Sequence, residues 1–79
     1  MDYDKEKVDE YTLALLYLVT HERQEGFVGA RAWKGFDWDT MNRLHEKGLI
    51  TNPVSKAKSV GMTEEGFKMS ESLFEKFFM

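Results

Sequence analysis

The chain has 79 residues, of which 42% are hydrophobic and 14% aromatic; it carries a formal net charge of −3 and contains no cysteine. This length predicts a single domain, 1–79, that buries only about 60% of its unfolded surface, so self-association is a common source of added stability. The lack of cysteine excludes disulfides, thiol chemistry and a cysteine-based zinc site.

Two further features bear on location. The amino terminus, MDYDKEKVDE, is acidic and lacks the basic-then-apolar pattern of a signal peptide. The longest apolar run, residues 13–19, is far shorter than the roughly 18 residues that a membrane span needs. A small domain without disulfides also fits a reducing compartment. We therefore expect a cytoplasmic protein that makes no contact with a membrane.

Charge is distributed unevenly along the chain. Residues 1–22 hold two lysines and six acidic residues, whereas residues 23–62 hold seven basic and four acidic residues. Residues 63–79 are again acidic, with two lysines and four glutamates. A nucleic-acid-binding domain usually has a stronger basic face than this mildly basic middle.

A first helix is expected after Asp4, whose carboxylate can cap free N–H groups. Apolar residues spaced three and four apart form one stripe, which predicts the buried face: Val8, Tyr11, Leu15, Leu18 and Val19. Four more apolar residues widen the stripe until it nearly surrounds the helix: Leu13, Ala14, Leu16 and Tyr17. A helix that is apolar on all sides is buried on all sides. We therefore expect a second copy of the chain to cover part of it.

The polar segment HERQEG, with Gly26, is expected to end this helix. The glycine, aromatic and β-branched residues of 27–33 then predict a short strand. A second helix fits Asp37–Lys47, with Asp37 as its N-cap and Gly48 as a left-handed C-cap.

The last third of the chain predicts a β-hairpin and a helix. Leu49–Thr51 and Ala57–Met62 fit two strands joined by a turn at Asn52 and Pro53. Thr63 is the expected cap of a final helix, and its apolar residues fall mainly on one face: Phe67, Leu73, Phe74, Phe77 and Phe78. The expected fold is a small α+β domain in the order α-β-α-β-β-α.

This order carries a resemblance. Leu44, Lys47-Gly48-Leu49-Ile50 and Met62-Thr63-Glu64-Glu65-Gly66 resemble the pattern of MarR- and PadR-type winged helices over about the last half of the chain. Through AWKGFDWD, LHEKGLI, SKAKSV and TEEG, nearly the whole chain is similar to a small uncharacterised bacterial family, a domain of unknown function. The resemblance implies a winged-helix-like fold with a short antiparallel sheet and a β-hairpin wing. It implies no activity, partner or site.

The chain also departs from that pattern. A standard winged helix has two helices between its first strand and its wing, and the second reads DNA in the major groove. Here one helix fits that interval, and its leading end carries Asp37 and Asp39, which repel phosphates.

The best nucleic-acid signal is the expected wing, where Lys56 and Lys58 flank Ala57. The same lysines would equally protect an exposed hairpin edge. Further basic residues could add to a nucleic-acid or partner contact: Arg31, Lys34, Arg43 and Lys47. Two to four phosphate contacts alone give weak, salt-sensitive binding.

Aromatic residues cluster beside two of these cations. Trp33 and Phe36, with Trp38, are candidates for stacking bases or gripping a peptide. The alternative is that the cluster belongs to the core, with Trp38 packed on Met41 and the first helix. In that case part of Trp33 or Phe36 would remain exposed as an interaction patch.

No catalytic, cofactor-binding or metal site is expected. His21 and His45 are the only histidines, and zinc needs at least three converging ligands. Asp37 and Asp39, two residues apart, do not share a helix face. The sequence has no nucleophile elbow and no phosphate-binding loop.

The apolar ends of the chain favour a homodimer. The candidate dimer contacts are Leu13, Leu16, Tyr17, Phe74, Phe77 and Phe78. The alternative is that the two terminal helices simply pack on each other. The sequence thus predicts a non-enzymatic protein-interaction or accessory regulatory module. A DNA-binding regulator that uses the Lys56/Lys58 wing is the alternative.

Overall fold

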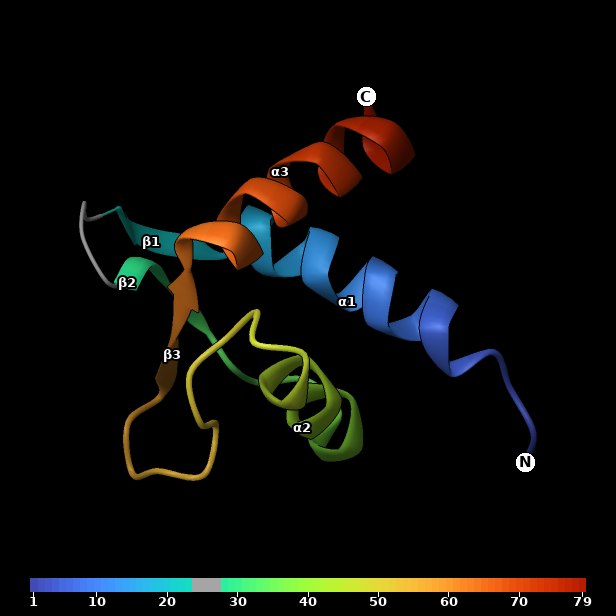
Figure 1. Cartoon of the computed structure of the whole chain (residues 1–79), viewed down its shortest axis with the longest axis horizontal. Helices are drawn as coiled ribbons and strands as arrows, with labels where there is room; N and C mark the ends of the chain where they lie inside the picture. Colours follow the sequence, from blue (N-terminus) through green and yellow to red (C-terminus); the bar gives the residue numbers. More distant parts are fainter. Residues whose placement is uncertain (24–27) are drawn as a thin grey trace.

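The computed structural model describes residues 1–23 and 28–79. Over these residues the chain forms, in order, α1 (Lys5–Leu18), β1 (Thr20–Arg23), β2 (Val28–Trp33), α2 (Trp38–Glu46), β3 (Ser59–Thr63) and α3 (Glu64–Phe78). In Figure 1, α1 runs through the middle of the molecule, with α3 on one side, α2 on the other and the sheet at its C-terminal end. The small α+β fold expected from the sequence is confirmed.

Helix α1 begins as predicted but buries a different face. The Asp4 carboxylate accepts a hydrogen bond from the Lys7 backbone N–H at 3.1 Å, which makes Asp4 the N-cap. The buried residues are Asp9, Thr12, Leu13, Ala14 and Leu16. Tyr11 and Leu18, from the predicted buried stripe, are instead 41% and 62% exposed. The predicted buried stripe is therefore wrong at Tyr11 and Leu18, because helical spacing alone fitted two faces of this nearly all-apolar helix.

The sheet is antiparallel and its strands follow chain order, β1-β2-β3. Ala30 lies opposite Met62 and Ala32 opposite Val60, and all four side chains are buried. Successive side chains of a strand point to opposite faces. This alternation places the four on the core face, while Arg31 and Trp33 take the other face.

The predicted order α-β-α-β-β-α needs correction to α-β-β-α-β-α over the described residues. Strand β1 directly follows α1 and pairs with β2, although its polar sequence THER was expected to be a helix end. A polar sequence can form a strand when its backbone finds a partner, and the sheet supplies one here. The expected strand at residues 27–33 is confirmed over its described part as β2, and Phe27 lies outside the described residues.

The expected second hairpin is narrower than predicted. Leu49–Thr51 forms no full strand but makes an isolated bridge, Ile50 to Met62, and the Thr51 N–H donates to the Gly61 carbonyl at 2.8 Å. The returning strand is Ser59–Thr63 rather than Ala57–Met62. Residues 52–58 form the loop that extends at the lower left of Figure 1.

Helix α2 has the predicted caps. The Asp37 carboxylate accepts from the Thr40 N–H at 3.1 Å and from the Thr40 hydroxyl at 2.9 Å. Gly48 has φ of 77°, the left-handed conformation that favours glycine. Trp38 does not pack into the core as expected: it is 62% exposed, because Met41 and Leu44 occupy the inward face of this helix.

Helix α3 starts at a close backbone crossing. The Thr63 hydroxyl accepts from the Gly66 N–H at 2.9 Å and donates to the Gly48 carbonyl at 2.9 Å, which ties the cap to the end of α2. A Cβ added at Gly66 would clash with the Leu49 carbonyl oxygen and would lie 2.7 Å from its carbonyl carbon. Glycine is therefore required at this position by the close approach of two backbones.

The core lies where these elements meet. Its buried apolar residues come from all three helices, strands β2 and β3, and the bridge segment: Leu13, Leu16, Ala30, Ala32, Met41, Leu44, Leu49, Ile50, Val60, Met62 and Phe67.

We predict that Gly66→Ala destabilises the domain by about 3 kcal/mol, since overpacking against a rigid backbone forces a shift of α3. Urea unfolding followed by circular dichroism measures the change. The matched control is Gly35→Ala, where an added Cβ meets nothing within 4 Å. Equal stability of the two variants would contradict the backbone crossing.

Candidate functional site

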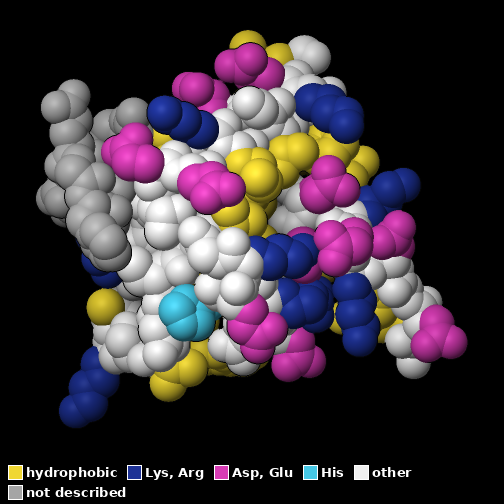
Figure 2. All heavy atoms as spheres, viewed as in Figure 1, with side chains coloured by type: hydrophobic (Ala, Val, Ile, Leu, Met, Phe, Trp, Pro, Cys, Tyr) yellow, Lys and Arg dark blue, Asp and Glu magenta, His cyan; other side chains and the backbone are white. Residues whose placement is uncertain are grey.

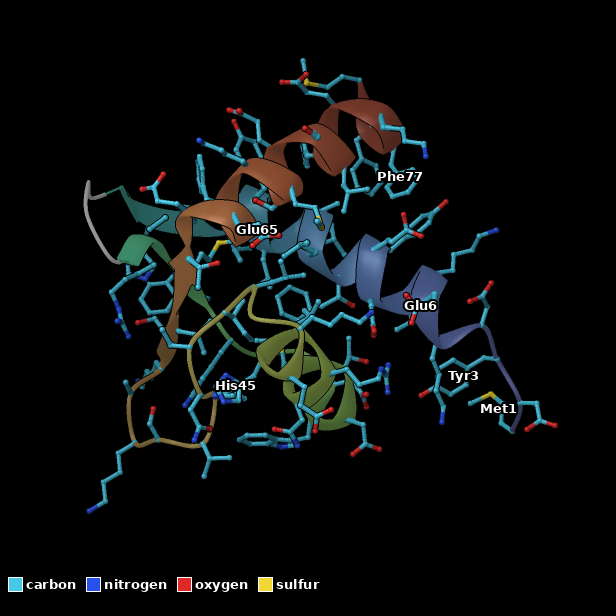
Figure 3. All side chains as sticks on the ribbon, viewed as in Figure 1. Met1, Tyr3, Glu6, His45, Glu65 and Phe77 are labelled. Carbon is cyan, nitrogen blue, oxygen red and sulfur yellow. The ribbon has the colours of Figure 1, made fainter. Side chains whose placement is uncertain are left out.

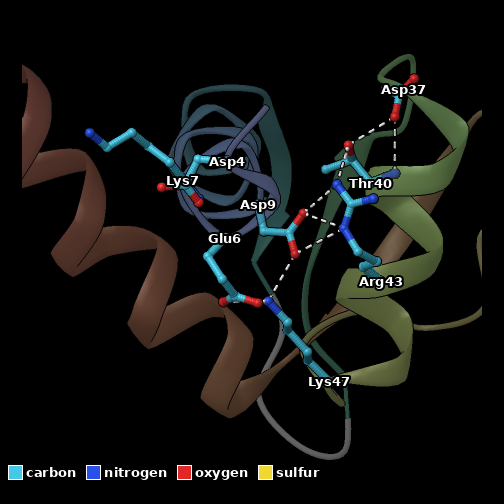
Figure 4. A network of polar contacts seen from close by, with 8 residues as sticks. All are labelled: Asp4, Glu6, Lys7, Asp9, Asp37, Thr40, Arg43 and Lys47. Atoms are coloured by element: carbon cyan, nitrogen blue, oxygen red, sulfur yellow. Dashed lines mark hydrogen bonds and ion pairs between the residues drawn. The ribbon is translucent and has the colours of Figure 1, made fainter. Parts of the chain in front are cut away.

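A buried carboxylate joins the first two helices. Asp9 on α1 is only 2% exposed, and its oxygens accept hydrogen bonds from two cations of α2. Arg43 donates from Nε to Oδ1 at 2.9 Å, with its Nη2 at 2.8 Å from the same oxygen. Lys47 donates from Nζ to Oδ2 at 2.8 Å. Figure 4 shows the three side chains meeting in the space between α1 and α2.

Helical spacing brings the members of this network together. Arg43 and Lys47 are four residues apart and so share one face of α2. Glu6 lies one turn before Asp9 on α1, and its carboxylate accepts from Lys47 Nζ at 3.1 Å. On the α2 side, the buried Thr40 hydroxyl accepts from Arg43 Nη2 at 3.1 Å. The buried charge is therefore fully paired, as burial of a carboxylate requires.

The network sets the charge state of its members. Burial by itself raises the pKa of Asp9, but hydrogen bonds from Arg43 and Lys47 outweigh that effect, and the pKa lies below its usual value. The hydrogen bond to Asp9 raises the pKa of Lys47 above its usual value. All three groups are therefore charged at neutral pH, and the network is structural rather than poised for proton transfer.

The six predicted basic contact residues do not form one free basic surface. Arg43 and Lys47 are engaged by Asp9. Arg31 donates from Nε to Ser59 Oγ at 3.0 Å, and Lys34 donates from Nζ to the carbonyls of Pro53 and Ser55, each at 2.8 Å. The Arg31 contact therefore connects β2 to β3, and the Lys34 contacts hold the 52–58 loop.

The remaining two predicted cations differ from the other four. Lys56 and Lys58 are exposed on the loop, and the described part of the chain offers their side-chain ammonium groups neither a hydrogen-bond nor an ion-pair partner. They are the members of the predicted set that stay available to a ligand.

Of the three aromatic residues considered for stacking or for the core, Trp33 and Trp38 are exposed and Phe36 is half-buried. Trp33 is 50% exposed and stacks on His21, with ring centroids 4.1 Å apart. Phe36 is half-buried and packs against the core. No pattern in the sequence predicted the His21–Trp33 pair, because β1, which carries His21, was not expected. His45, labelled in Figure 3, is exposed at the end of α2, where its Nδ1 lies 3.1 Å from the Ile50 carbonyl.

The structure corrects part of the predicted dimer surface. Leu13 and Leu16 are 1% and 0% exposed, so they belong to the core of a single chain. The Tyr17 hydroxyl donates to Glu71 on α3 at 3.3 Å, and its ring packs on Phe74. Of the predicted contacts, Phe74 and Phe77 are half-buried, while Phe78 is 47% exposed.

An apolar strip remains on the outside of the helix pair, and we call it the outer face. It comprises Val8, Tyr11, Leu15 and Leu18 on α1 together with Phe78 on α3. Tyr11 connects the two helices: its ring stacks on Phe77 at 4.3 Å and meets Phe78 edge-on at 6.4 Å. The spacing of residues predicted this strip but assigned it to the core.

A second feature is a groove of about 350 Å³ that we call the interhelical groove. Its floor is mainly apolar and is lined by Leu13, Leu44, Leu49, Met69 and Leu73, beside the buried carboxylate of Asp9. Glu6, Glu10, Glu65 and Lys47 line its rim. Figure 2 shows hydrophobic side chains in a hollow near the centre of this face, with acidic side chains on either side. Glu65 comes from α3 and Glu6 from α1 (Figure 3).

Other site types find no support in the described residues. Residues 1–23 and 28–79 contain no group of three or more histidine, aspartate or glutamate side chains placed to hold a metal ion. Among the same residues, no helix is both long and apolar enough to cross a membrane.

We predict that Asp9→Asn lowers the free energy of unfolding by about 2–3 kcal/mol, because it leaves two cations facing a neutral group. Urea unfolding measures the loss, and Asp2→Asn, an exposed position before α1, is the control with the same change.

The substitution Asp9→Asn should also change how the free energy of unfolding depends on pH. A depressed pKa means that the stabilisation by Asp9 is present above the unfolded-state value of about 4 and is lost as pH falls through the lower native value. The stability of Asp9→Asn should therefore fall less than that of the native chain below about pH 4. An equal loss of stability by the two proteins as the pH falls would contradict the role of this carboxylate.

Comparison with known proteins is consistent with an uncharacterised family. The uncharacterized protein y4hR of Sinorhizobium fredii (strain NBRC 101917 / NGR234) is 49% identical over 78 residues, covering 99% of this chain and 97% of that protein. No solved structure matches the chain significantly. The family described as a domain of unknown function (DUF6429) matches residues 4–79. The chain therefore belongs to the DUF6429 family, whose function is unknown.

Proposed function

We propose that this protein is a non-enzymatic interaction module that works in the bacterial cytoplasm as a homodimer formed through the outer face. One observation carries the proposal: the fold leaves an apolar strip on α1 and the end of α3 uncovered, with Tyr11, Leu18 and Phe78 exposed by 41%, 62% and 47%. Contiguous exposed apolar surface of this kind marks interaction sites.

The spacing of the strip favours pairing with another helix. Val8, Tyr11, Leu15 and Leu18 follow the 3-4-3 spacing of a coiled-coil seam. In an antiparallel pair of α1 helices about a two-fold axis, Tyr11 would face Leu15 of the partner, and Val8 would face Leu18. A two-fold interface uses the same patch on both copies, so a self-complementary strip fits a second copy of this chain.

The charges beside the strip also permit self-pairing. The seam positions are flanked by Lys7, Thr12, Ala14 and Val19. A two-fold axis places each flank of the seam against the same flank of the partner, so Lys7 would lie at one end of the pair and Lys7 of the partner at the other. No like charges would therefore face each other along the pair, which removes the usual electrostatic obstacle to a symmetric contact.

The polar chemistry supports a binding role over catalysis. The buried carboxylate of Asp9, the kind of group that catalysis often employs, is held by Arg43 and Lys47 on the opposite helix. Its pKa lies below the usual value. A general acid or base needs a pKa nearer to the working pH.

We predict that Leu18→Glu weakens the dimer by about 100-fold, because two leucines, one from each copy, lose roughly 1.5 kcal/mol each on exposure. Sedimentation velocity or light scattering across micromolar concentrations measures the mass. The control is Val54→Glu, which changes an equally exposed apolar residue, 68% exposed, on the 52–58 loop. A native chain that stays monomeric throughout this range would refute the homodimer.

A second candidate function, DNA binding, has its own supporting observation. We infer that α2, the Ile50–Met62 pairing and α3 correspond to the back half of a winged helix, with residues 52–58 as the wing. Lys56 and Lys58 are exposed on this loop. The candidate is the weaker one because Asp37 and Asp39 lead α2, and its cations Arg43 and Lys47 are engaged by Asp9.

For this candidate we predict weak backbone contact only. Duplex DNA at low salt should shift NMR signals of residues 54–60, and Lys56→Glu with Lys58→Glu should abolish the shifts. About two phosphate contacts predict a roughly tenfold affinity loss between 50 and 200 mM salt. Lys5→Glu with Lys68→Glu, at exposed positions outside this loop, is the control for the same loss of positive charge. Binding that survives both wing substitutions would remove the wing from the DNA hypothesis.

A further inference from the structure

We propose that the interhelical groove binds a short basic amphipathic segment of a partner protein, with an apolar side chain on its floor and lysine or arginine at its rim. The proposal rests on the interaction role above and names the chemistry of the partner.

The floor of the groove offers an apolar surface for a side chain of the partner. Leu13 and Leu44 lie at its base, each 1% exposed, and Met69 on α3 is 41% exposed. The groove is thus apolar at its base and open to solvent above it. Methionine adapts its shape readily to an inserted side chain. A volume of about 350 Å³ suits one or two anchoring side chains rather than an enclosed substrate.

The rim of the groove carries the charges that would select the partner. Glu10 and Glu65 are exposed, and neither side-chain carboxylate makes a hydrogen bond or ion pair with the described part of the chain. Among the described residues Lys47 is the one cation that lines the groove, and its Nζ already donates to Glu6 at 3.1 Å and to Asp9 at 2.8 Å. The rim therefore presents net negative charge, which selects a basic segment and disfavours nucleic acid.

The location permits both interactions at once. The groove takes Glu6, Glu10 and Leu13 from α1, whereas the outer face takes Tyr11 and Leu18. At 100° per residue these two sets point to opposite sides of the helix. A dimer formed through the outer face would therefore carry two open grooves, and the loss of one interaction would not imply the loss of the other.

Helix-in-groove recognition reads apolar anchors at i and i+4. The probe is therefore an amidated 12-residue peptide of lysine and alanine with two leucines four residues apart. Calorimetry at low salt measures its affinity, and NMR maps its site. We expect shifts at Leu13, Met69 and Leu73. Exchange of both leucines for serine should weaken binding at least about tenfold, in keeping with two apolar side chains losing their burial.

Charge reversal on the protein separates this site from general attraction. Glu65→Lys with Glu10→Lys should weaken the peptide about tenfold, because both carboxylates face the bound cations. The control is Glu75→Lys combined with Glu46→Lys, which makes the same change of net charge at exposed positions that do not line the groove. It should weaken binding no more than about twofold, as expected for distant screened charges.

Three results would overturn the proposal. Equal weakening by the two double variants, or equal binding of the leucine and serine peptides, would indicate non-specific attraction to an acidic protein. A change in self-association of Glu65→Lys would instead place a second copy in the groove, by way of its Val54, Lys56 and Lys58. Leu18→Glu should bind the peptide normally, so that failure of the dimer and failure of the groove remain distinct.

Discussion

The ion pairs of Asp9 determine how the helices of this domain are arranged. A carboxylate that is 2% exposed is unfavourable unless it is paired, and the two cations that pair it lie on one face of α2. This requirement places α2 against the Asp9 side of α1. The side of α1 that carries Leu13 and Leu16 then faces the core, and the side that carries Tyr11 and Leu18 is left outside.

The crossing of Leu49 and Gly66 completes the arrangement on the other side. The Thr63 hydroxyl bonds the start of α3 to the end of α2 through the Gly48 carbonyl. Three helices thus converge near Leu49, and the interhelical groove is the space that remains between them. The same contacts that stabilise the fold therefore shape the groove. The outer face, by contrast, is a consequence of what the fold does not cover.

Local signals in the sequence were sufficient for the starts of the three helices and for the end of α2. Asp4, Asp37 and Thr63 cap their helices, and Gly48 takes the left-handed conformation, because each effect depends on a few neighbouring residues. Strand β1 was missed because its polar residues gain a strand conformation from pairing with β2, which is a non-local interaction. The buried face of α1 was misassigned for a similar reason. Its inward face contains the charged Asp9, and a prediction from helical periodicity assigns charged residues to the solvent-exposed face.

The candidate site shows the same limit. Arg43 and Lys47 were interpreted as free surface cations, since nothing near them in sequence reveals that Asp9, 34 and 38 residues away, accepts their hydrogen bonds. Lys56 and Lys58 stayed exposed as expected because no distant partner reaches their side chains among the described residues. The acidic rim of the groove could not be predicted for the same reason: Glu10 and Glu65 line one groove only in the folded chain.

The central claim is that α1 has two distinct apolar faces, one facing the core and one open for a second copy. Leucine methyl NMR with a soluble paramagnetic agent tests it most directly, at high dilution and at high concentration. The account predicts strong broadening of Leu18 at high dilution, protection of Leu18 at high concentration, and protection of Leu13 and Leu16 at both. Broadening of Leu13 or Leu16 at dilution, or of Leu18 at every concentration, would contradict it.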